Sequence, residues 1–313
     1  MPAVAIVGTG LIGRSWAIVF ARAGWEVRIT DPSADQLAAA PRLIRQGLDE
    51  LAAHGLAADA AAAARRVSAV ASLTEAVRGV DLVQENGPES VEIKRRLFAE
   101  VDCLAPAGAV LASSSSAIVA SRFTETLAHR ERCLVAHPVN PPHLVPLVEL
   151  CGAPWTAAAI IERARGIYNS VGQVPIVVNR EVEGFVLNRL QGALLSEALR
   201  LVEEGIVGPH DLDKTVKDGL GLRWSFLGPF ETIELNAPGG IADYCARYGG
   251  FYRRLAADPP QPEVWDEASV ARILAVWGEA PGADRFAATS AWRDACLTAL
   301  RAHKAAQTPP DAA

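Results

Sequence analysis

The stretch AVAIVGTGLIGRSWAIVFARAGWEVRITD, residues 3–31, decides the fold. It runs from an apolar segment through three closely spaced glycines into a helix-like segment, and then into a second strand-like run that ends at Asp31. Gly8, Gly10 and Gly13 have the G-x-G-x-x-G spacing directly after a predicted strand and directly before a predicted helix, and this context makes the motif specific. The stretch therefore predicts a strand–loop–helix–strand unit that binds a dinucleotide.

Each glycine of this loop has a separate role. The first permits a tight turn, the second lets the backbone approach a pyrophosphate, and the third lets helix and strand pack closely, while the helix amino terminus faces the phosphates. Asp31 lies eighteen residues after the last glycine, where its carboxylate can bind the adenosine ribose and would repel the extra phosphate of NADP. The sequence thus favours NAD over NADP as the cofactor. It also favours a cofactor-binding loop over a glycine turn that only packs. The predicted cofactor-binding residues of the loop are Gly8, Gly10, Leu11, Ile12 and Gly13.

Strand-like runs alternate with longer Ala- and Arg-containing stretches up to about residue 184, which is typical of a parallel sheet with crossover helices. The Ala-rich stretch 55–66 is interpreted as part of a helical hairpin, because Ala is the best helix former. Beyond Gly184 the pattern becomes helical. We predict a doubly wound (Rossmann) α/β domain over 1–184 and an all-helical domain over 185–313. The strand-like runs are AVAIV, EVRIT, RVSAV, DLVQE, AVLAS, CLVAH, LVEL and VPIVV.

The composition excludes several classes of protein. The chain has 313 residues, half of them apolar, which suffices for two domains with large cores. Its net charge is −6, without the basic stripe or tail that a nucleic acid or an anionic membrane would need. No apolar run approaches the roughly 20 residues that span a bilayer, and no export leader is recognised. We expect a cytoplasmic protein without nucleic-acid or membrane partners.

The five cysteines are widely spaced, form no CxxC pair and are odd in number. This pattern argues against both a disulfide framework and a zinc cluster. We expect buried thiols in a reducing compartment and no bound metal. The cysteines are Cys103, Cys133, Cys151, Cys245 and Cys296.

A histidine stands at the end of a predicted strand in the stretch AHPVNPP, residues 136–142. Ligands of doubly wound sheets bind outside the carboxyl ends of the strands, so His137 is expected on the cofactor's side. Glu149 follows twelve residues later. If 133–137 and 147–150 are two strands joined by the Pro-rich bend, the carboxylate can bind one ring nitrogen and leave the other as a base. Oxidation of an alcohol by hydride transfer needs such a base.

These features together resemble the L-3-hydroxyacyl-CoA dehydrogenase family. The resemblance rests on H-x-x-N with an acid twelve residues after the histidine, a serine-rich run before it and GFVLNRL after it. HPVNPPHLVPLVEL, GFVLNRLQGALLSEALRLVEEGIV and GLGLRWSFLGPFET are most similar to the lambda-crystallin branch, which includes L-gulonate 3-dehydrogenase. The similarity covers nearly the whole chain. It implies an NAD-dependent dehydrogenase whose helical domain closes over the nicotinamide and builds a homodimer interface.

The resemblance also implies roles for individual residues. His137 is then the general base and Glu149 its partner. Ser116 and Asn188 hydrogen-bond the reacting oxygen of the substrate, and Asn140 supports the nicotinamide side of the pocket.

Three further assignments follow from the same resemblance. The SSSS run leaves the serine ambiguous by one position, so Ser115 is the alternative to Ser116. Glu89 and Lys94 match the family's acid and lysine near the nicotinamide ribose, although a Glu and a Lys near a helix start are commonly just solvated.

The sequence departs from the acyl-CoA pattern in the hairpin after the second strand. Acyl-CoA members offer a serine and a lysine to CoA there, whereas the first lysine of this chain is Lys94. Arg65 and Arg66 remain as cations that could meet a phosphate. The absence of lysine therefore weakens the CoA interpretation without excluding it.

A second departure is the LRWSFL segment between Gly221 and Gly228, which adds the cation Arg223. A guanidinium binds a carboxylate with two parallel hydrogen bonds, so we hypothesise that Arg223 holds the C1 carboxylate of a free 3-hydroxy acid. The alternative is a loop arginine paired with a surface acid.

The predicted reaction is the reversible oxidation of the C3 hydroxyl of an L-3-hydroxy acid, with the proton to His137 and the hydride to NAD. Two alternatives stay open: a short-chain L-3-hydroxyacyl-CoA dehydrogenase, and a non-catalytic NAD-binding structural protein. The sequence names neither the acid nor the physiological direction. Aromatic residues of the helical domain are expected in a core or an interface, with the core favoured for most. They are Trp224, Phe226, Trp265, Trp277 and Trp292.

Overall fold

A computed structural model of the chain describes residues 1–307, and it divides into two compact units. The first consists of Met1–Val186 and the segment from Ser290 onward, and the second is Leu187–Thr289. The sequence pattern assigned 185–313 to a single helical domain, whereas the structure groups the last helix with the first unit because Leu297 packs against that unit's core. An independent domain over 185–313 stays a prediction.

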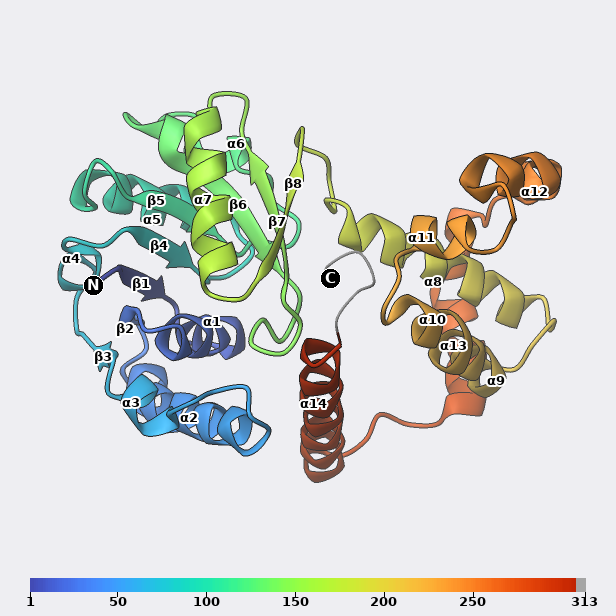
Figure 1. Cartoon of the computed structure of the whole chain (residues 1–313), viewed down its shortest axis with the longest axis horizontal. Helices are drawn as coiled ribbons and strands as arrows, with labels where there is room; N and C mark the ends of the chain where they lie inside the picture. Colours follow the sequence, from blue (N-terminus) through green and yellow to red (C-terminus); the bar gives the residue numbers. More distant parts are fainter. Residues whose placement is uncertain (308–313) are drawn as a thin grey trace. The chain divides into compact units, whose positions relative to one another are not determined.

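An eight-stranded sheet with the order β3-β2-β1-β4-β5-β6-β7-β8 forms the centre of the first unit (Figure 1). All eight predicted strand-like runs are strands, which confirms the doubly wound α/β fold. The sheet is parallel except at one pair, because β6 and β7 follow each other through a short bend and pair antiparallel. The strands are β1 (Ala3–Val7), β2 (Glu26–Thr30), β3 (Val67–Ala69), β4 (Leu82–Glu85), β5 (Val110–Ser113), β6 (Cys133–Pro138), β7 (Leu147–Gly152) and β8 (Val174–Val178).

Helices cover both faces of this sheet. Successive side chains of a strand point to opposite faces, so Val4 and Ile6 of β1 belong to one buried cluster, and Ala5 and Val7 to the other. The first cluster lies under α1, α2 and α7, and the second under α4, α5 and α6. The helices of this unit are α1 (Leu11–Arg22), α2 (Ala34–Ala53), α3 (Ala60–Ala64), α4 (Leu73–Val77), α5 (Val91–Leu104), α6 (Ser121–Thr124) and α7 (Ala158–Ser170), with a 3₁₀ turn η1 (Arg130–Arg132).

The Ala-rich stretch 55–66 folds as predicted into the second arm of a helical hairpin. The carboxylate of Asp59 accepts a hydrogen bond from the amide of Ala62 (2.8 Å) and so caps the amino end of α3. Buried Ala60 and Ala63 on α3 join the same core cluster as the apolar side of α2.

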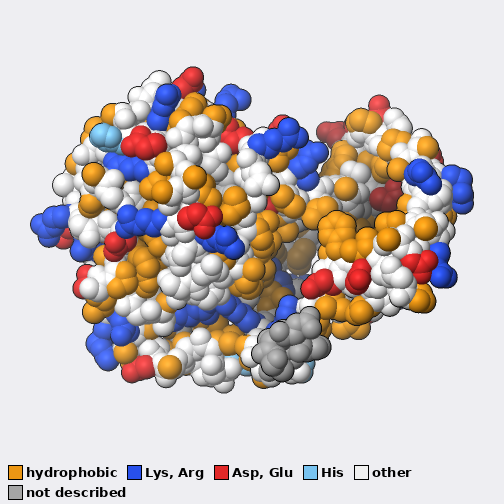
Figure 2. Space-filling model, turned by 45° about the horizontal axis from the view of Figure 1, so that its top comes forward, with side chains coloured by type: hydrophobic (Ala, Val, Ile, Leu, Met, Phe, Trp, Pro, Cys, Tyr) orange, Lys and Arg blue, Asp and Glu red, His pale blue; other side chains and the backbone are white. Residues whose placement is uncertain are grey.

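The second unit consists of helices and buries few side chains. Among its described residues, Pro209, Ala237, Val264 and Ser269 are the buried ones. Apolar side chains lie open on the surface (Figure 2). Its helices are α8 (Leu187–Glu203), α9 (Pro209–Lys214), the π-helical η2 (Thr215–Leu220), α10 (Gly221–Trp224), α11 (Pro229–Glu234), α12 (Gly240–Ala256), the 3₁₀ turn η3 (Pro262–Trp265) and α13 (Glu267–Trp277), while α14 (Ala283–Ala305) continues into the first unit.

Two predictions about burial were wrong. Five aromatic side chains of the helical domain were favoured for a core, but in the single chain they are between 42% and 68% exposed. They are Trp224, Phe226, Trp265, Trp277 and Trp292. Of the cysteines, only Cys133 and Cys151 are buried, where burial raises the pKa of each thiol to about 12. The other three, on helices α5, α12 and α14, are exposed. None of the helices within 1–307 is long and apolar enough to cross a membrane.

His143, in the loop between β6 and β7, lies against two arginines of neighbouring helices. Its carbonyl oxygen accepts hydrogen bonds from Arg22 at the end of α1 (3.5 Å) and from Arg301 on α14. Its Nδ1 atom is buried without a hydrogen-bond partner in the described part of the chain. The pKa of His143 is lowered from 6.5 to about 4, mainly by burial and also by the charges of Arg22 and Arg301, which Asp294 opposes.

This histidine should make the fold sensitive to mild acid. Between pH 6.5 and pH 4 the unfolded chain binds a proton at His143 that the folded chain does not, so stability falls as the pH falls through this window. The depressed pKa corresponds to a loss of about 3 kcal/mol. We expect His143→Gln to remove most of that loss, measured as the free energy of unfolding in urea at both ends of the window. The same pH dependence in both proteins would contradict the assignment.

Candidate active site

The glycine loop that joins β1 to α1 is closely packed at Gly8 and Gly13. Gly8 has a left-handed backbone (φ +92°), and a Cβ atom at Gly13 would lie 1.8 Å from the Gly8 carbonyl oxygen. A Cβ atom at Gly10 would meet nothing within 4 Å. Leu11 begins α1 with its side chain exposed, whereas Ile12 packs against the core. The loop is therefore closed on the protein side and open at Gly10, as a backbone that approaches a phosphate must be.

The carboxylate of Asp31, just beyond β2, is held in a fixed position beside this loop. Oδ2 accepts hydrogen bonds from the Thr9 amide (2.6 Å) and the Thr9 hydroxyl (3.0 Å), and Oδ1 accepts one from the Ser33 amide (2.8 Å). Gly10 and Asp31 both line a cavity of about 1480 Å³ that extends to Arg96 on α5. The open glycine, the fixed carboxylate and the size of the cavity fit a dinucleotide with free ribose hydroxyls.

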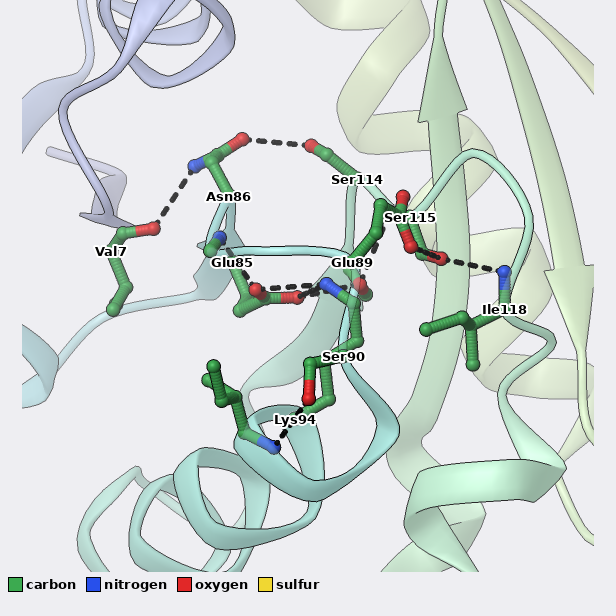
Figure 3. A network of polar contacts seen from close by, with 12 residues as sticks. Val7, Glu85, Asn86, Glu89, Ser90, Lys94, Ser114, Ser115 and Ile118 are labelled. Atoms are coloured by element: carbon green, nitrogen blue, oxygen red, sulfur yellow. Dashed lines mark hydrogen bonds and ion pairs between the residues drawn. The ribbon is translucent and has the colours of Figure 1, made fainter.

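A buried ion pair lies behind the turn that follows β4. Lys94 Nζ contacts the two oxygens of the Glu85 carboxylate at 2.9 and 3.0 Å, and both side chains are 1% exposed. Glu85 also accepts hydrogen bonds from the Ser113 hydroxyl (2.6 Å) and the Gly87 amide (2.6 Å). The Lys94 ammonium, expected near the nicotinamide ribose, thus binds a carboxylate inside the protein (Figure 3). Through the Gly87 amide, the same carboxylate holds the 86–88 turn, which lines the cavity.

The Glu89 carboxylate binds the loop after β5 through hydrogen bonds. In this loop the two candidate serines, Ser115 and Ser116, differ in their contacts and exposure. The Ser115 hydroxyl donates to Glu89 Oε2 (2.8 Å) and accepts a hydrogen bond from the Ile118 amide (2.9 Å) (Figure 3). Ser115 is 1% exposed, whereas Ser116, whose amide donates to Glu89 Oε1, is exposed. The Ser115 hydroxyl is therefore occupied and shielded, and the Ser116 side chain reaches solvent.

His137 and Glu149 are directly opposite each other on the antiparallel strands β6 and β7. His137 Nδ1 lies 2.8 Å from Glu149 Oε2, with His137 4% and Glu149 0% exposed. An ionised carboxylate can only accept, so Nδ1 carries the proton and Nε2 is left as the basic nitrogen. The Val186 amide donates to the other oxygen, Oε1 (2.9 Å). The structure thus brings together the pair on which the predicted chemistry depends.

The remaining predicted residues lie in three different places. Asn140 is exposed in the loop after β6, followed by a cis peptide bond to Pro141. Asn188 is partly buried near the start of α8, and Arg223 is exposed on α10. Both of these belong to the second unit. A hydrogen bond with Tyr252 raises the pKa of Tyr244, and the nearby charge of Arg223 opposes that rise.

Several residues of the site were not foreseen from the sequence. Thr9, Glu85 and Val186 act through hydrogen bonds to a predicted residue or turn. The Ser114 hydroxyl accepts hydrogen bonds from Trp16 Nε1 (3.0 Å) and Gln84 Nε2 (2.8 Å). It donates to Asn86 Oδ1 (2.8 Å), and Asn86 lines the cavity. The position of polar residues at strand ends was the available signal, since side chains there line the ligand edge of the sheet.

Two family models match the chain. The NAD binding domain of 3-hydroxyacyl-CoA dehydrogenase matches residues 3–182, and the C-terminal domain of the same enzyme matches residues 184–272. The chain belongs to the 3-hydroxyacyl-CoA dehydrogenase family. This membership confirms NAD as the cofactor and a dehydrogenase of the type that oxidises a hydroxyl group.

Individual relatives place the chain within the 3-hydroxyacyl-CoA dehydrogenase family. The lambda-crystallin homolog of Bos taurus is 46% identical over 302 residues, which cover 95% of this chain and 94% of that protein. L-carnitine dehydrogenase of Pseudomonas aeruginosa is 36% identical over 297 residues, 95% of this chain and 92% of that enzyme. The predicted lambda-crystallin branch is thereby confirmed.

A solved structure agrees with this placement. The NAD⁺-dependent 5-formyl-3-hydroxy-2-methylpyridine 4-carboxylic acid 5-dehydrogenase superposes with a TM-score of 0.86 and 28% sequence identity, covering 98% of this chain and all of that one. The Rossmann-like sheet and the helical region that follows it are thus shared with a dehydrogenase.

Proposed function

We propose that this protein oxidises the C3 hydroxyl of a free L-3-hydroxy acid, as an L-gulonate 3-dehydrogenase does, with His137 as the general base. The observation that carries the proposal is the buried contact of 2.8 Å between His137 Nδ1 and Glu149 Oε2. NAD, when bound at the glycine loop and Asp31, would supply the hydride acceptor. The protein's own task is to remove the hydroxyl proton and to hold the reacting carbon still.

The His137–Glu149 pair is suited to that proton transfer. The carboxylate fixes the tautomer, so that Nε2 can take the proton of the substrate hydroxyl. When the ring becomes positively charged, the buried carboxylate at 2.8 Å stabilises it, because the attraction between charges is strong where water is excluded. In the reverse direction the same nitrogen returns the proton. A base in a fixed position of this kind typically contributes 10²- to 10⁴-fold to a rate.

Three polar side chains are proposed to hold the substrate and the cofactor around this base. Ser116 and Asn188 would hydrogen-bond the reacting oxygen, and Asn140 would support the nicotinamide side. Ser115 is buried whereas Ser116 is exposed, which favours Ser116 as the serine that reaches substrate. Glu89 would act near the nicotinamide ribose through the loop that it fastens, and Lys94 through its pair with Glu85.

Two observations favour a free acid over a CoA thioester. L-carnitine is itself a free 3-hydroxy acid, and the L-carnitine dehydrogenase noted above aligns over nearly the full length of both chains. The α2–α3 hairpin, where acyl-CoA members are expected to offer a lysine, contains none. A short-chain L-3-hydroxyacyl-CoA dehydrogenase remains the second candidate, supported by the family name and by the cations Arg65 and Arg66 after α3.

Replacement of Arg223 tests the free-acid substrate directly. If its guanidinium binds the C1 carboxylate, we expect Arg223→Met to raise the KM for the acid by roughly 10- to 100-fold, the value of one charge-assisted contact, with little change in kcat. Arg223→Lys should recover part of the loss, because it restores the charge but not the bidentate fork. Steady-state kinetics with the acid measure both. An unchanged KM in Arg223→Met would show that Arg223 is a surface residue.

A non-catalytic NAD-binding role is the alternative from a different class. A structural protein gains nothing from a histidine and a glutamate buried against each other, since removing ionisable groups from water costs free energy that their pairing has to offset. The intact pair therefore favours an active enzyme.

We further propose that two copies assemble through the helical unit. Within Leu187–Thr289 only four residues are buried, which is far fewer than an isolated domain of this size requires. Aromatic side chains such as Trp224, Phe226 and Phe230 are exposed there, and such residues are enriched at obligate interfaces. A cytoplasmic location stays a prediction.

A further inference from the structure

The turn that ends the first unit, residues 182–186, has an unusual backbone. Phe185 has φ +47°, in the left-handed region that a bulky side chain rarely adopts, and Gly184 before it has φ +76°. The Phe185 amide donates to the Val182 carbonyl oxygen (3.1 Å), which closes the turn. Glycine at 185 would adopt this conformation without strain. The contacts of the Phe185 side chain must therefore offset the strain of this backbone conformation.

The Phe185 ring packs beside the catalytic pair. It is 0% exposed, and its centroid lies 5.5 Å from that of His137 at an interplanar angle of 33°. The ring also belongs to the buried cluster beneath α5 and α6. It thus connects a rigid core to the imidazole and limits the rotation of His137 about its own axis.

The same turn delivers a hydrogen-bond donor to the carboxylate. The Val186 amide donates to Glu149 Oε1 at 2.9 Å, while Oε2 of that carboxylate faces His137. With both oxygens bound, the carboxylate cannot rotate without losing a bond. The left-handed conformation at Phe185 turns the chain so that the next amide points at Glu149.

We propose that Phe185 is a positioning residue for the His137–Glu149 pair. Its ring fixes the imidazole, and its backbone conformation brings the Val186 amide to Glu149, so that one turn holds both members of the pair. The kinetic part of this inference rests on the proposed function, while the geometric part does not. The turn ends where α8 begins, two residues before Asn188.

Two substitutions separate the ring from the backbone. Phe185→Gly keeps the left-handed turn without strain and removes the ring, whereas Phe185→Leu keeps an apolar side chain under the same backbone constraint. We expect Phe185→Gly to lower kcat by roughly 10- to 100-fold, the cost of a small misplacement of a catalytic group, while the KM for NAD stays unchanged. Phe185→Leu should recover most of the turnover. Residual NAD affinity reports that each variant has folded.

Proton NMR supplies a readout that a merely structural role would not change. The shared proton between His137 Nδ1 and Glu149 should give a low-field resonance in the wild type that His137→Gln removes. It should broaden or vanish in Phe185→Gly and persist in Phe185→Leu. Wild-type turnover together with an intact resonance in Phe185→Gly would overturn the proposal.

Hydrogen exchange of the wild-type protein covers the case in which Phe185→Gly does not fold. The Val186 amide should exchange slowly, and Glu149→Ala should remove its protection. A Val186 amide that exchanges freely in the wild type overturns the proposal by itself. Neither NMR nor hydrogen exchange needs a substrate, so failure of the wild type to oxidise any 3-hydroxy acid would refute the proposed function and leave the positioning role standing.

Discussion

His137→Ala is expected to lower kcat by about 10²- to 10⁴-fold while the affinity for NAD stays unchanged. The magnitude is that of a general base in a fixed position. The ring is required to move a proton and not to hold the cofactor, whose predicted contacts lie at the glycine loop and Asp31 on another part of the sheet edge. Stopped-flow or steady-state kinetics give the turnover, and titration calorimetry gives the NAD affinity.

Two variants make this result specific. Glu149→Gln should also lower turnover, because a neutral amide neither stabilises the imidazolium nor dictates which nitrogen is protonated. His129→Ala is the matched control, since that imidazole is largely exposed, with 60% of its side chain accessible. Full activity in His137→Ala would show that the base lies elsewhere.

Gly13→Ala is expected to lose NAD binding and to lower the stability of the protein without cofactor. The added methyl group would lie 1.8 Å from the Gly8 carbonyl oxygen, so the loop or the start of α1 must move. Overpacking of this kind costs about 3 kcal/mol, and more when the obstacle is backbone. Thermal unfolding without NAD and calorimetric titration with NAD measure the two effects.

Gly10→Ala separates packing from cofactor binding in the same loop. Its methyl group meets no atom of the protein within 4 Å, so the cofactor-free protein should be as stable as the wild type. NAD affinity should nevertheless fall, because the backbone at the second glycine approaches the pyrophosphate. If Gly10→Ala binds NAD normally, the phosphates do not lie against this loop.

Much of the first unit could be predicted because its signals are local. Each strand is a short apolar run next to a turn, and the G-x-G-x-x-G motif stands between one such run and a helix. The His137–Glu149 contact followed from two strands joined by a short Pro-rich bend, since that connection forces them to lie side by side.

The details of the site depend on contacts between distant residues, which a single sequence does not reveal. Lys94 resembles a solvated lysine near a helix start, yet it is buried against Glu85 because β4 ends beside α5. A left-handed Phe185 contradicts the preference of its own side chain and could not be predicted from propensity. Such local conflicts are expected where function constrains the chain.

In the helical unit, the burial of the aromatic residues was predicted wrongly for a different reason. Its periodic apolar residues predicted helices correctly, but the periodicity does not say whether an apolar face packs within the chain or against another copy. The aromatic residues Trp224, Trp265 and Trp277 were therefore favoured for a core over an interface, whereas they are exposed in the single chain.

The proposed oxidation of a free 3-hydroxy acid is tested by following NADH formation by the purified protein. L-Gulonate, other free L-3-hydroxy acids and L-3-hydroxybutyryl-CoA are compared in parallel. We expect turnover of one or more free acids, no comparable turnover of the thioester, and loss of the activity in His137→Ala. A clear preference for L-3-hydroxybutyryl-CoA, or NAD binding without oxidation of any of these compounds, would contradict it.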